Sequence, residues 1–162
     1  ARYQPGAASF PRGGEQIAVD KPKVAVVGYG YAGRCFHPYL VGLASQLELY
    51  GVVSSRPEAR AQIQSQLGVK VFARFEEVLA DPAVDLVVLA TPNDLHAAQA
   101  IQALEAGKHV VTDKPMCLST AEADAMIGAS RARALSNAPG ARSRSAAGHA
   151  HHDWPACSCR RA

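Results

Sequence analysis

Residues 23–33, Lys-Val-Ala-Val-Val-Gly-Tyr-Gly-Tyr-Ala-Gly, decide the fold of this chain. An apolar run typical of a strand leads directly into a G-x-G-x-x-G turn, and a helical pattern follows. Gly28 would permit the tight turn, Gly30 would let the backbone approach a pyrophosphate, and Gly33 would let the helix pack close to the strand. An ordinary glycine-rich turn is the alternative, but the flanking strand and helix argue against it. The pattern therefore predicts a dinucleotide site with the phosphates at the N-terminus of the helix.

Length and composition indicate one globular domain. The chain has 162 residues, of which 48% are hydrophobic, and this is enough for a proper core. It has no apolar stretch long enough to span a membrane, so no membrane association is expected. Residues 1–22 are rich in glycine and proline and lack the apolar centre of a secretory signal. We therefore expect a disordered leader and a cytoplasmic protein.

The net charge of +3 does not indicate a nucleic-acid partner, because it comes from the tail. From residue 131 onward there are six arginines and one acid, Asp153, so this segment carries +5 and the rest of the chain −2. Small and polar residues dominate the tail, which predicts disorder over 135–162. The histidine and cysteine groups at 149–152 and 157–159 match no closed zinc site, so no metal is expected.

Strand and helix patterns alternate from residue 23 to residue 134. Five such units predict an α/β fold, a doubly wound parallel sheet of the Rossmann type with helices on both faces. The expected strands are 23–27, 48–54, 70–72, 84–90 and 109–112, and the expected helices are 31–45, 57–67, 75–80, 93–107 and 119–134. Asn93 is the expected cap of the fourth helix, and Ser119 with Glu122 has the spacing of a capping box. Ligands of such sheets bind at the carboxyl ends of the strands, near the switch in strand order.

The end of the second strand indicates which dinucleotide binds. Folds that prefer NAD usually place Asp or Glu here, to accept hydrogen bonds from the adenosine ribose. This chain has Ser54, Ser55 and Arg56 instead. Two hydroxyls can donate to a 2′-phosphate, and the guanidinium can pair with it in bidentate fashion. We therefore expect NADP, with NAD as the second choice. The alternative is that Ser55 or Arg56 only caps the helix beginning at Pro57 and that Arg56 is solvated.

Two further motifs follow strands, Thr91-Pro92-Asn93-x-x-His96 and an Ala-Gly-Lys-His-Val-x-x-Asp-Lys-Pro run over 106–115. Together with the glycine turn they resemble the Gfo/Idh/MocA oxidoreductases, which include glucose–fructose oxidoreductase and the inositol dehydrogenases. The stretch 30–38 and the Ser-Ser-Arg sequence at 54–56 are most similar to the branch of NADP-dependent scyllo-inositol dehydrogenase. The resemblance covers roughly residues 23–130, with three motifs in the right order at three strand ends.

The resemblance implies a role for each matched position. The implied cofactor-binding residues are Gly28, Tyr29, Gly30, Tyr31, Ala32 and Gly33 at the pyrophosphate, Ser54, Ser55 and Arg56 around the adenosine ribose, Thr91, Pro92, Asn93 and His96 along the path to the nicotinamide ribose, and Asp113, Lys114 and Pro115 at the end of the fifth strand.

Lys114 is the implied catalytic residue. It would reach the nicotinamide ribose and the reacting hydroxyl, where an ammonium stabilises the developing alkoxide during hydride transfer at a secondary alcohol of a sugar or cyclitol. Pro115 would fix the loop, in a Lys-Pro bond that is often cis in this family. Position 113 is more commonly Glu in the family, and Asp113 keeps the acidity. The alternatives are a solvated lysine in a proline turn and, for His96, a surface or capping role.

The resemblance stops after residues 135–136, where the family continues into a sixth strand and a second α/β domain that binds substrate. The change to a tail of Ala, Arg, Ser, Gly and Pro is typical of a GC-rich gene read out of frame, and the other two reading frames after codon 134 test this hypothesis. Without a sixth strand, residues 109–112 would form an open sheet edge that invites a homo-oligomer. The expected function is an NAD(P)-dependent oxidoreductase. The alternative is a catalytically incomplete nucleotide-binding fragment, which would act on a sugar or cyclitol only if a second domain were supplied.

Overall fold

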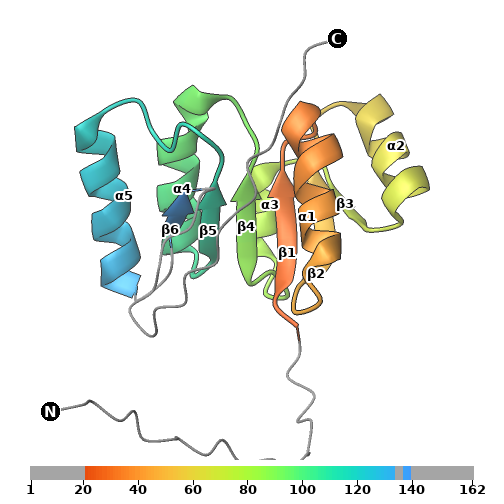
Figure 1. The fold of residues 1–162 in the computed structure, drawn as a ribbon, viewed down its shortest axis with the longest axis horizontal. Coiled ribbons are helices and arrows are strands. Elements are labelled where there is room, and N and C mark those ends of the chain that lie inside the picture. Colours follow the sequence, from red (N-terminus) through yellow and green to blue (C-terminus); the bar gives the residue numbers. More distant parts are fainter. Residues whose placement is uncertain (1–20, 134–136, 140–162) are drawn as a thin grey trace, which may run out of the picture.

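The computed structural model of the protein describes residues 21–133 and 137–139. Its elements, in chain order, are β1 (Lys23–Val27), η1 (Ala32–Phe36), α1 (His37–Leu43), β2 (Glu48–Val53), α2 (Pro57–Leu67), β3 (Lys70–Phe72), α3 (Phe75–Ala80), β4 (Leu86–Leu89), η2 (Asn93–Leu95), α4 (His96–Glu105), β5 (His109–Thr112), α5 (Thr120–Arg133) and β6 (Asn137–Pro139). All paired strands run parallel, in the order β3-β2-β1-β4-β5-β6 (Figure 1). The strand order reverses between β1 and β4, which makes this the switch point of a doubly wound sheet.

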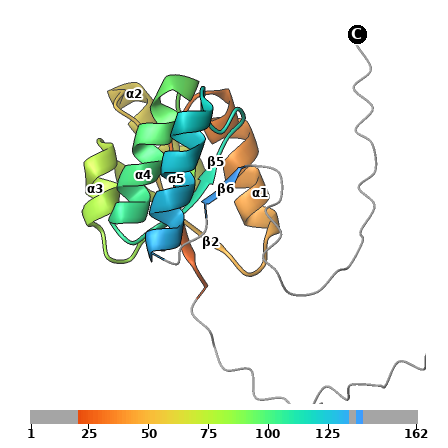
Figure 2. The same cartoon turned by 90° about the vertical axis from the view of Figure 1, so that its left-hand side faces the viewer.

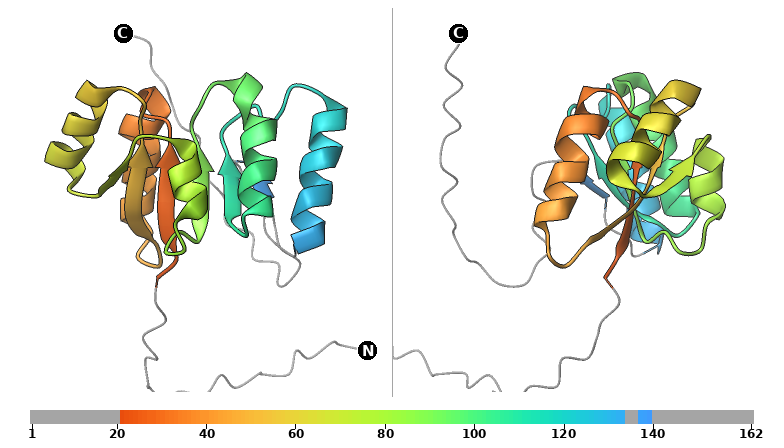
Figure 3. Two further views of the ribbon diagram at one scale, coloured as in Figure 1. Left: turned by 180° about the vertical axis from the view of Figure 1, so that it is seen from behind. Right: turned by 90° about the vertical axis from the view of Figure 1, so that its right-hand side faces the viewer.

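Helices cover the sheet in two layers, with α1 and α2 on one face and α3, α4 and α5 on the other (Figures 2 and 3). Alternate residues of β1 supply the two cores, because successive side chains of a strand point to opposite faces. Val24 and Val26 pack with Ile63 of α2, whereas Ala25 and Val27 belong to the core that contains Leu104 of α4. The parallel sheet is therefore buried on both faces, as the apolar strands require.

The expected fold class is confirmed, and five of the expected elements, β1, α2, β3, α3 and β5, have the predicted bounds. The helix after the glycine turn differs, because its first five residues form the wider π-helical segment η1 before α1. Asn93 as a helix cap is wrong: it lies within the 3-10 turn η2, and its side chain makes no capping hydrogen bond. Ser119 caps α5, since its hydroxyl accepts the Glu122 N–H at 3.2 Å.

The predicted open edge at β5 is wrong. Residues 137–139 form β6, which pairs with β5 in parallel register from Val110–Asn137 to Thr112–Pro139. Strand pairing joins backbone groups, so the composition of this stretch did not predict the strand. The expectation of a homo-oligomer depended on an open edge at β5, and β6 covers that edge.

Several expectations concern residues outside those that the structure describes. They are the disorder of 1–20, the disorder of the tail over 140–162, and the histidine and cysteine groups at 149–152 and 157–159. Within residues 21–133 and 137–139, no helix combines the length and apolar character needed to cross a membrane.

Candidate functional site

The glycine turn brings three strand ends into direct contact. The Gly28 N–H donates to the Val53 carbonyl at 3.2 Å, and the Ala90 N–H donates to the Val27 carbonyl at 2.9 Å. Gly28 has φ +101°, and a Cβ there would lie 2.6 Å from the Ala90 oxygen. Only glycine combines this dihedral angle with so close a neighbour.

The third and second glycines of the motif have opposite surroundings. A Cβ on Gly33 would overlap the Gly28 carbonyl oxygen and lie 2.9 Å from its carbon. The close packing predicted for Gly33 is therefore present, but its neighbour is the turn itself rather than the strand. A Cβ on Gly30 would meet no described atom within 4 Å. The backbone at Gly30 is thus open to close approach by another molecule.

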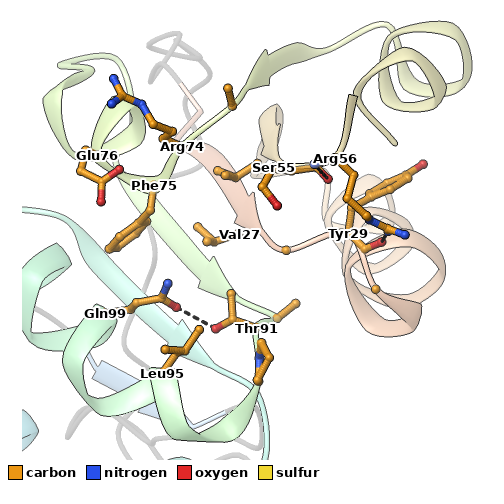
Figure 4. Close-up of a pocket in the computed structure, with 17 residues that line it drawn as sticks. Val27, Tyr29, Ser55, Arg56, Arg74, Phe75, Glu76, Thr91, Leu95 and Gln99 are labelled. Atoms are coloured by element: carbon orange, nitrogen blue, oxygen red, sulfur yellow. Dashed lines mark hydrogen bonds between the residues drawn. The ribbon is translucent and has the colours of Figure 1, made fainter. Parts of the chain in front are cut away.

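A groove of about 650 Å³ runs along the carboxyl ends of β1 to β4 (Figure 4). The predicted site residues that line it are Gly28, Tyr29, Gly30, Ser54, Ser55, Arg56, Thr91 and Pro92. The predicted site residues that do not line it are Tyr31, Ala32, Gly33, Asn93, His96, Asp113, Lys114 and Pro115. The groove therefore brings together the glycine turn and the Ser-Ser-Arg sequence, which the sequence assigned to one ligand.

Two arginines hold the loop at the end of β2. Arg56 donates through Nη2 to the Tyr29 carbonyl at 3.0 Å, so it ties this loop to the glycine turn instead of being merely solvated. Arg60, in the first turn of α2, donates through Nη1 to the carbonyls of Ser54 at 3.1 Å and Ser55 at 2.8 Å. Arg60 was missed by the sequence analysis. Its position four residues after Arg56, on the same side of α2, was the available signal.

The sequence analysis also missed the wall of the groove that follows β3. Arg74, Phe75 and Glu76 line it, and Leu95 and Gln99 add the wall after β4. The Thr91 hydroxyl lies 2.7 Å from the Gln99 side-chain oxygen and donates to it. Because ligands of this fold bind at carboxyl ends of strands, the end of β3 could have been included on the same rule that selected the ends of β2 and β4.

His96 is a buried connector, so the surface or capping role is wrong. Its side chain is 0% exposed. Nδ1 lies 2.8 Å from the Pro115 carbonyl oxygen, and Nε2 lies 2.9 Å from the Thr91 carbonyl oxygen. Both partners are carbonyl oxygens, so the ring nitrogen that carries the hydrogen donates to its partner, and which nitrogen that is depends on the tautomer. His96 thus ties the loop after β4 to the loop after β5 and does not face the groove.

Lys114 lies one strand beyond the groove, at the end of β5. The Lys114–Pro115 peptide is cis, as expected, and the Lys114 side chain is exposed. Asp113 accepts the Lys114 N–H at 2.8 Å through Oδ1, and its Oδ2 lies 3.5 Å from Nε2 of the buried His37. The predicted acid and lysine therefore lie side by side, with His37 of α1 behind them.

Two carboxylates near or below the groove have displaced pKa values. The Ala73 N–H donates to Glu77 at 2.9 Å and holds the pKa of Glu77 below its ordinary value, against the opposing effect of burial. At the opposite edge of the sheet, the Lys70 ammonium lies 2.7 Å from Asp81, lowers the pKa of Asp81 and has its own pKa raised. The hydrogen bond from Ala73 therefore favours the ionised form of Glu77.

Comparison with known proteins supports one family. Residues 22–137 match the family model of the GFO_IDH_MocA oxidoreductases, described as an oxidoreductase family with an NAD-binding Rossmann fold. The uncharacterized oxidoreductase YdgJ of Escherichia coli is 40% identical over 104 residues, which are 64% of this chain and 30% of that protein. The scyllo-inositol 2-dehydrogenase (NADP(+)) IolW of Bacillus subtilis is 33% identical over 109 residues, 67% of this chain and 30% of that protein.

Solved structures show the same correspondence. An NAD-binding protein from Listeria innocua superposes with a TM-score of 0.70 at 38% identity, over 74% of this chain and 35% of that one. A crystal structure of an oxidoreductase from Klebsiella pneumoniae gives a TM-score of 0.69 at 37% identity, over 74% and 34%. The chain thus spans about a third of the length of the proteins that it matches.

Proposed function

The chain belongs to the Gfo/Idh/MocA oxidoreductase family, and on that premise we propose that it binds NADP at the groove and serves hydride transfer at a secondary alcohol of a sugar or cyclitol. The observation that carries the proposal is the groove itself, which lies across the switch point beside the glycine turn. The strand ends from β3 to β5 are spaced by about 4.8 Å each, so they offer an edge of about 19 Å to an extended dinucleotide.

The residues present fit a dinucleotide. The open backbone at Gly30 leaves room for a pyrophosphate, and η1 continues into α1 behind it with its N–H groups at the turn. Gly28, Tyr29 and Gly30 would hold the phosphates. Thr91 and Pro92 would lie along the path to the nicotinamide ribose, with Asn93 at its exposed end. Tyr31, Ala32 and Gly33 would contribute through the backbone and packing of the turn.

A preference for NADP is supported by the end of β2. No carboxylate is present among residues 52–57, and the Ser54 and Ser55 hydroxyls can donate to a 2′-phosphate. Arg56 lies on the same loop, within reach of the glycine turn. NAD remains the second choice, because Glu76 adds a carboxylate to the groove from the wall after β3.

Bound NADP would supply the acceptor for hydride. In that reaction a carbinol carbon would lose a hydride and its hydroxyl a proton, so that the alcohol would be oxidised to a ketone. Lys114 would stabilise the developing alkoxide, and Asp113 and Pro115 would fix the loop that carries it. His96 would hold this loop against Thr91.

A catalytically incomplete nucleotide-binding fragment is the second candidate, because the chain spans about 30% of the relatives' length. Its substrate would then be handled only with a second domain. Turnover of scyllo-inositol with NADP by the purified chain separates the two candidates. Turnover supports the enzyme, and binding without turnover supports the fragment.

A fluorescence titration with NADPH and, in parallel, NADH tests the proposal directly. We expect saturable binding that favours NADPH and is lost in Gly30→Val, whose side chain would enter open space beside the turn. Gly42→Val is the matched control, because a Cβ there also meets no described atom within 4 Å but lies on α1, away from the groove. Equal binding by wild type and Gly30→Val would contradict the proposed site.

A further inference from the structure

The wall after β3 stands beside the loop that would hold the adenosine ribose. Val53 pairs with Phe72 in the parallel register of β2 and β3, and the Ser54 N–H donates to the Phe72 carbonyl at 3.0 Å. Continuing that register by two residues places Arg74 next to Ser55, about one strand spacing away. Figure 4 shows Ser55 between Arg74 on one side and Arg56 on the other, with the Arg74 guanidinium directed away from Ser55, so the exposed side chain would turn toward the groove to meet a ligand there.

The three arginines around this loop, Arg56, Arg60 and Arg74, differ in the hydrogen bonds that they already make. Arg56 donates to the Tyr29 carbonyl, and Arg60 donates to the Ser54 and Ser55 carbonyls. Within the described part of the chain, Arg74 meets Glu77 through Nε at 3.4 Å, and its side chain is 74% exposed. Within the described residues, its two terminal nitrogens make no hydrogen bond, so both can donate to a ligand at this end of the groove.

A phosphate monoester suits these donors better than a ribose hydroxyl does. A guanidinium presents two parallel N–H groups that match two phosphate oxygens, and a charged pair of this kind is stronger than a neutral hydrogen bond. Glu76 lies two residues beyond Arg74 in the same wall and also lines the groove. Its carboxylate would repel a phosphate, so the wall carries one group that favours the 2′-phosphate and one that opposes it.

We propose that Arg74 is a specificity-determining residue that contacts the 2′-phosphate of the bound dinucleotide from the β3 wall, opposite Arg56, and that Glu76 limits the resulting preference. This inference rests on the proposed function, because it assigns the adenosine end of that same site. Arg60 is a positioning residue here, since it donates to the carbonyls of Ser54 and Ser55 and so holds the loop that carries both hydroxyls.

The test compares dissociation constants for NADPH and NADH, and for adenosine 2′,5′-bisphosphate and ADP, in wild type and variants. We expect Arg74→Ala to weaken NADPH and the bisphosphate about tenfold and to change NADH and ADP less than twofold. Arg74→Lys should recover part of the loss, because it keeps the charge without the planar pair of donors. Glu76→Gln should tighten NADPH severalfold. Arg131→Ala, an exposed arginine on α5, removes the same charge far from the groove and should leave all four constants unchanged.

The outcomes separate the two proposals. If Arg74→Ala weakens NADPH and NADH equally, or weakens neither while wild type binds NADPH, the assignment of Arg74 is wrong and the proposed function stands. If folded wild type binds none of the four probes, the proposed function itself is refuted. Loss of folding in Arg74→Ala is checked by thermal unfolding, and Arg74→Lys and Glu76→Gln then still decide the ratio of NADPH to NADH affinity.

Discussion

The substitution Gly33→Ala tests whether the glycine turn is built as the structure indicates. Gly33 is buried, and a Cβ on it would overlap the Gly28 carbonyl oxygen. Gly28 cannot retreat, because its own φ is +101° and the Ala90 carbonyl oxygen stands 2.6 Å from where its Cβ would be. The start of the helix must therefore move away until the new methyl group of residue 33 lies at least 3.0 Å from the Gly28 carbonyl oxygen.

The cost follows from this geometry. Inserting one methyl into a packed site costs about 1–3 kcal/mol, and backbone on both sides places this case near 3 kcal/mol. That is a large part of the 5–15 kcal/mol that stabilises a typical domain, but it leaves the protein folded at room temperature. At about 4–8 °C per kcal/mol, the melting temperature should fall by roughly 12–24 °C. Moving the helix start also moves the N–H groups at the turn, so NADPH should bind at least tenfold more weakly.

Thermal unfolding and NADPH titration measure both effects, with Gly42→Ala as the matched control. Gly42 lies in α1, and a Cβ there meets no described atom within 4 Å. This control should raise stability by up to about 1 kcal/mol, because alanine loses less entropy than glycine in a helix. The same substitution thus has opposite signs at the two positions. A Gly33→Ala protein that melts within about 4 °C of wild type would refute the reasoning, since that shift corresponds to less than 1 kcal/mol.

Three further predictions follow from contacts elsewhere in the site and fold. His96→Ala truncates a fully buried side chain and removes the link between the loops after β4 and β5, so it should lower the free energy of unfolding by about 2–5 kcal/mol in urea titrations. The exposed Gln102→Ala on the same helix should change it by less than about 0.5 kcal/mol. Lys114→Ala should change the NADPH dissociation constant less than about threefold, because Lys114 is exposed and outside the groove, but any turnover obtained should fall about 100-fold or more. The hydrogen bond from Lys70 lowers the pKa of Asp81 below its ordinary value of 3.8. The stability that this pair contributes is therefore present above pH 3.8 and is lost as the pH falls through the pKa of Asp81 in the folded protein. Asp81→Asn should consequently lose less stability than wild type between about pH 6 and pH 3.

Short stretches of sequence predicted the strands and helices whose ends are set by neighbouring residues. The apolar run 23–27 and the helix Pro57–Leu67 have the predicted bounds, because proline in the first turn and the left-handed Gly68 after the last residue mark the ends of that helix. Short-range signals also predicted about half of the residues that line the groove, because glycine and serine at strand ends indicate a phosphate site whatever lies around them. The prediction that Asn93 caps a helix was wrong, because an Asn after Thr-Pro fits a helix cap and a 3-10 turn equally well.

The rest could not be found by pattern, because it depends on residues far apart in the chain. His96 and Pro115 are separated by 19 positions, and His37 and Asp113 by 76. Nothing local distinguishes a histidine that joins two loops from one at the surface. β6 was missed for the opposite reason, since backbone pairing to β5 needs no side-chain signature. The residue pattern therefore pointed to the strand ends where the groove lies, and the tertiary contacts determine which of the predicted residues touch one another.

Side chains cover several carbonyl oxygens of the strand-end loops, which would favour a phosphate-bearing ligand in the groove. Three side chains face five carbonyl oxygens of the strand-end loops: Arg56 faces Tyr29, Arg60 faces Ser54 and Ser55, and His96 faces Thr91 and Pro115. A carbonyl oxygen left bare at the rim would repel a phosphate, whereas one already paired with a cationic or N–H donor is largely compensated. The positive end of the helix and these paired carbonyls would act in the same direction, so under the proposed function phosphate binding would depend on the whole loop cluster rather than on one arginine.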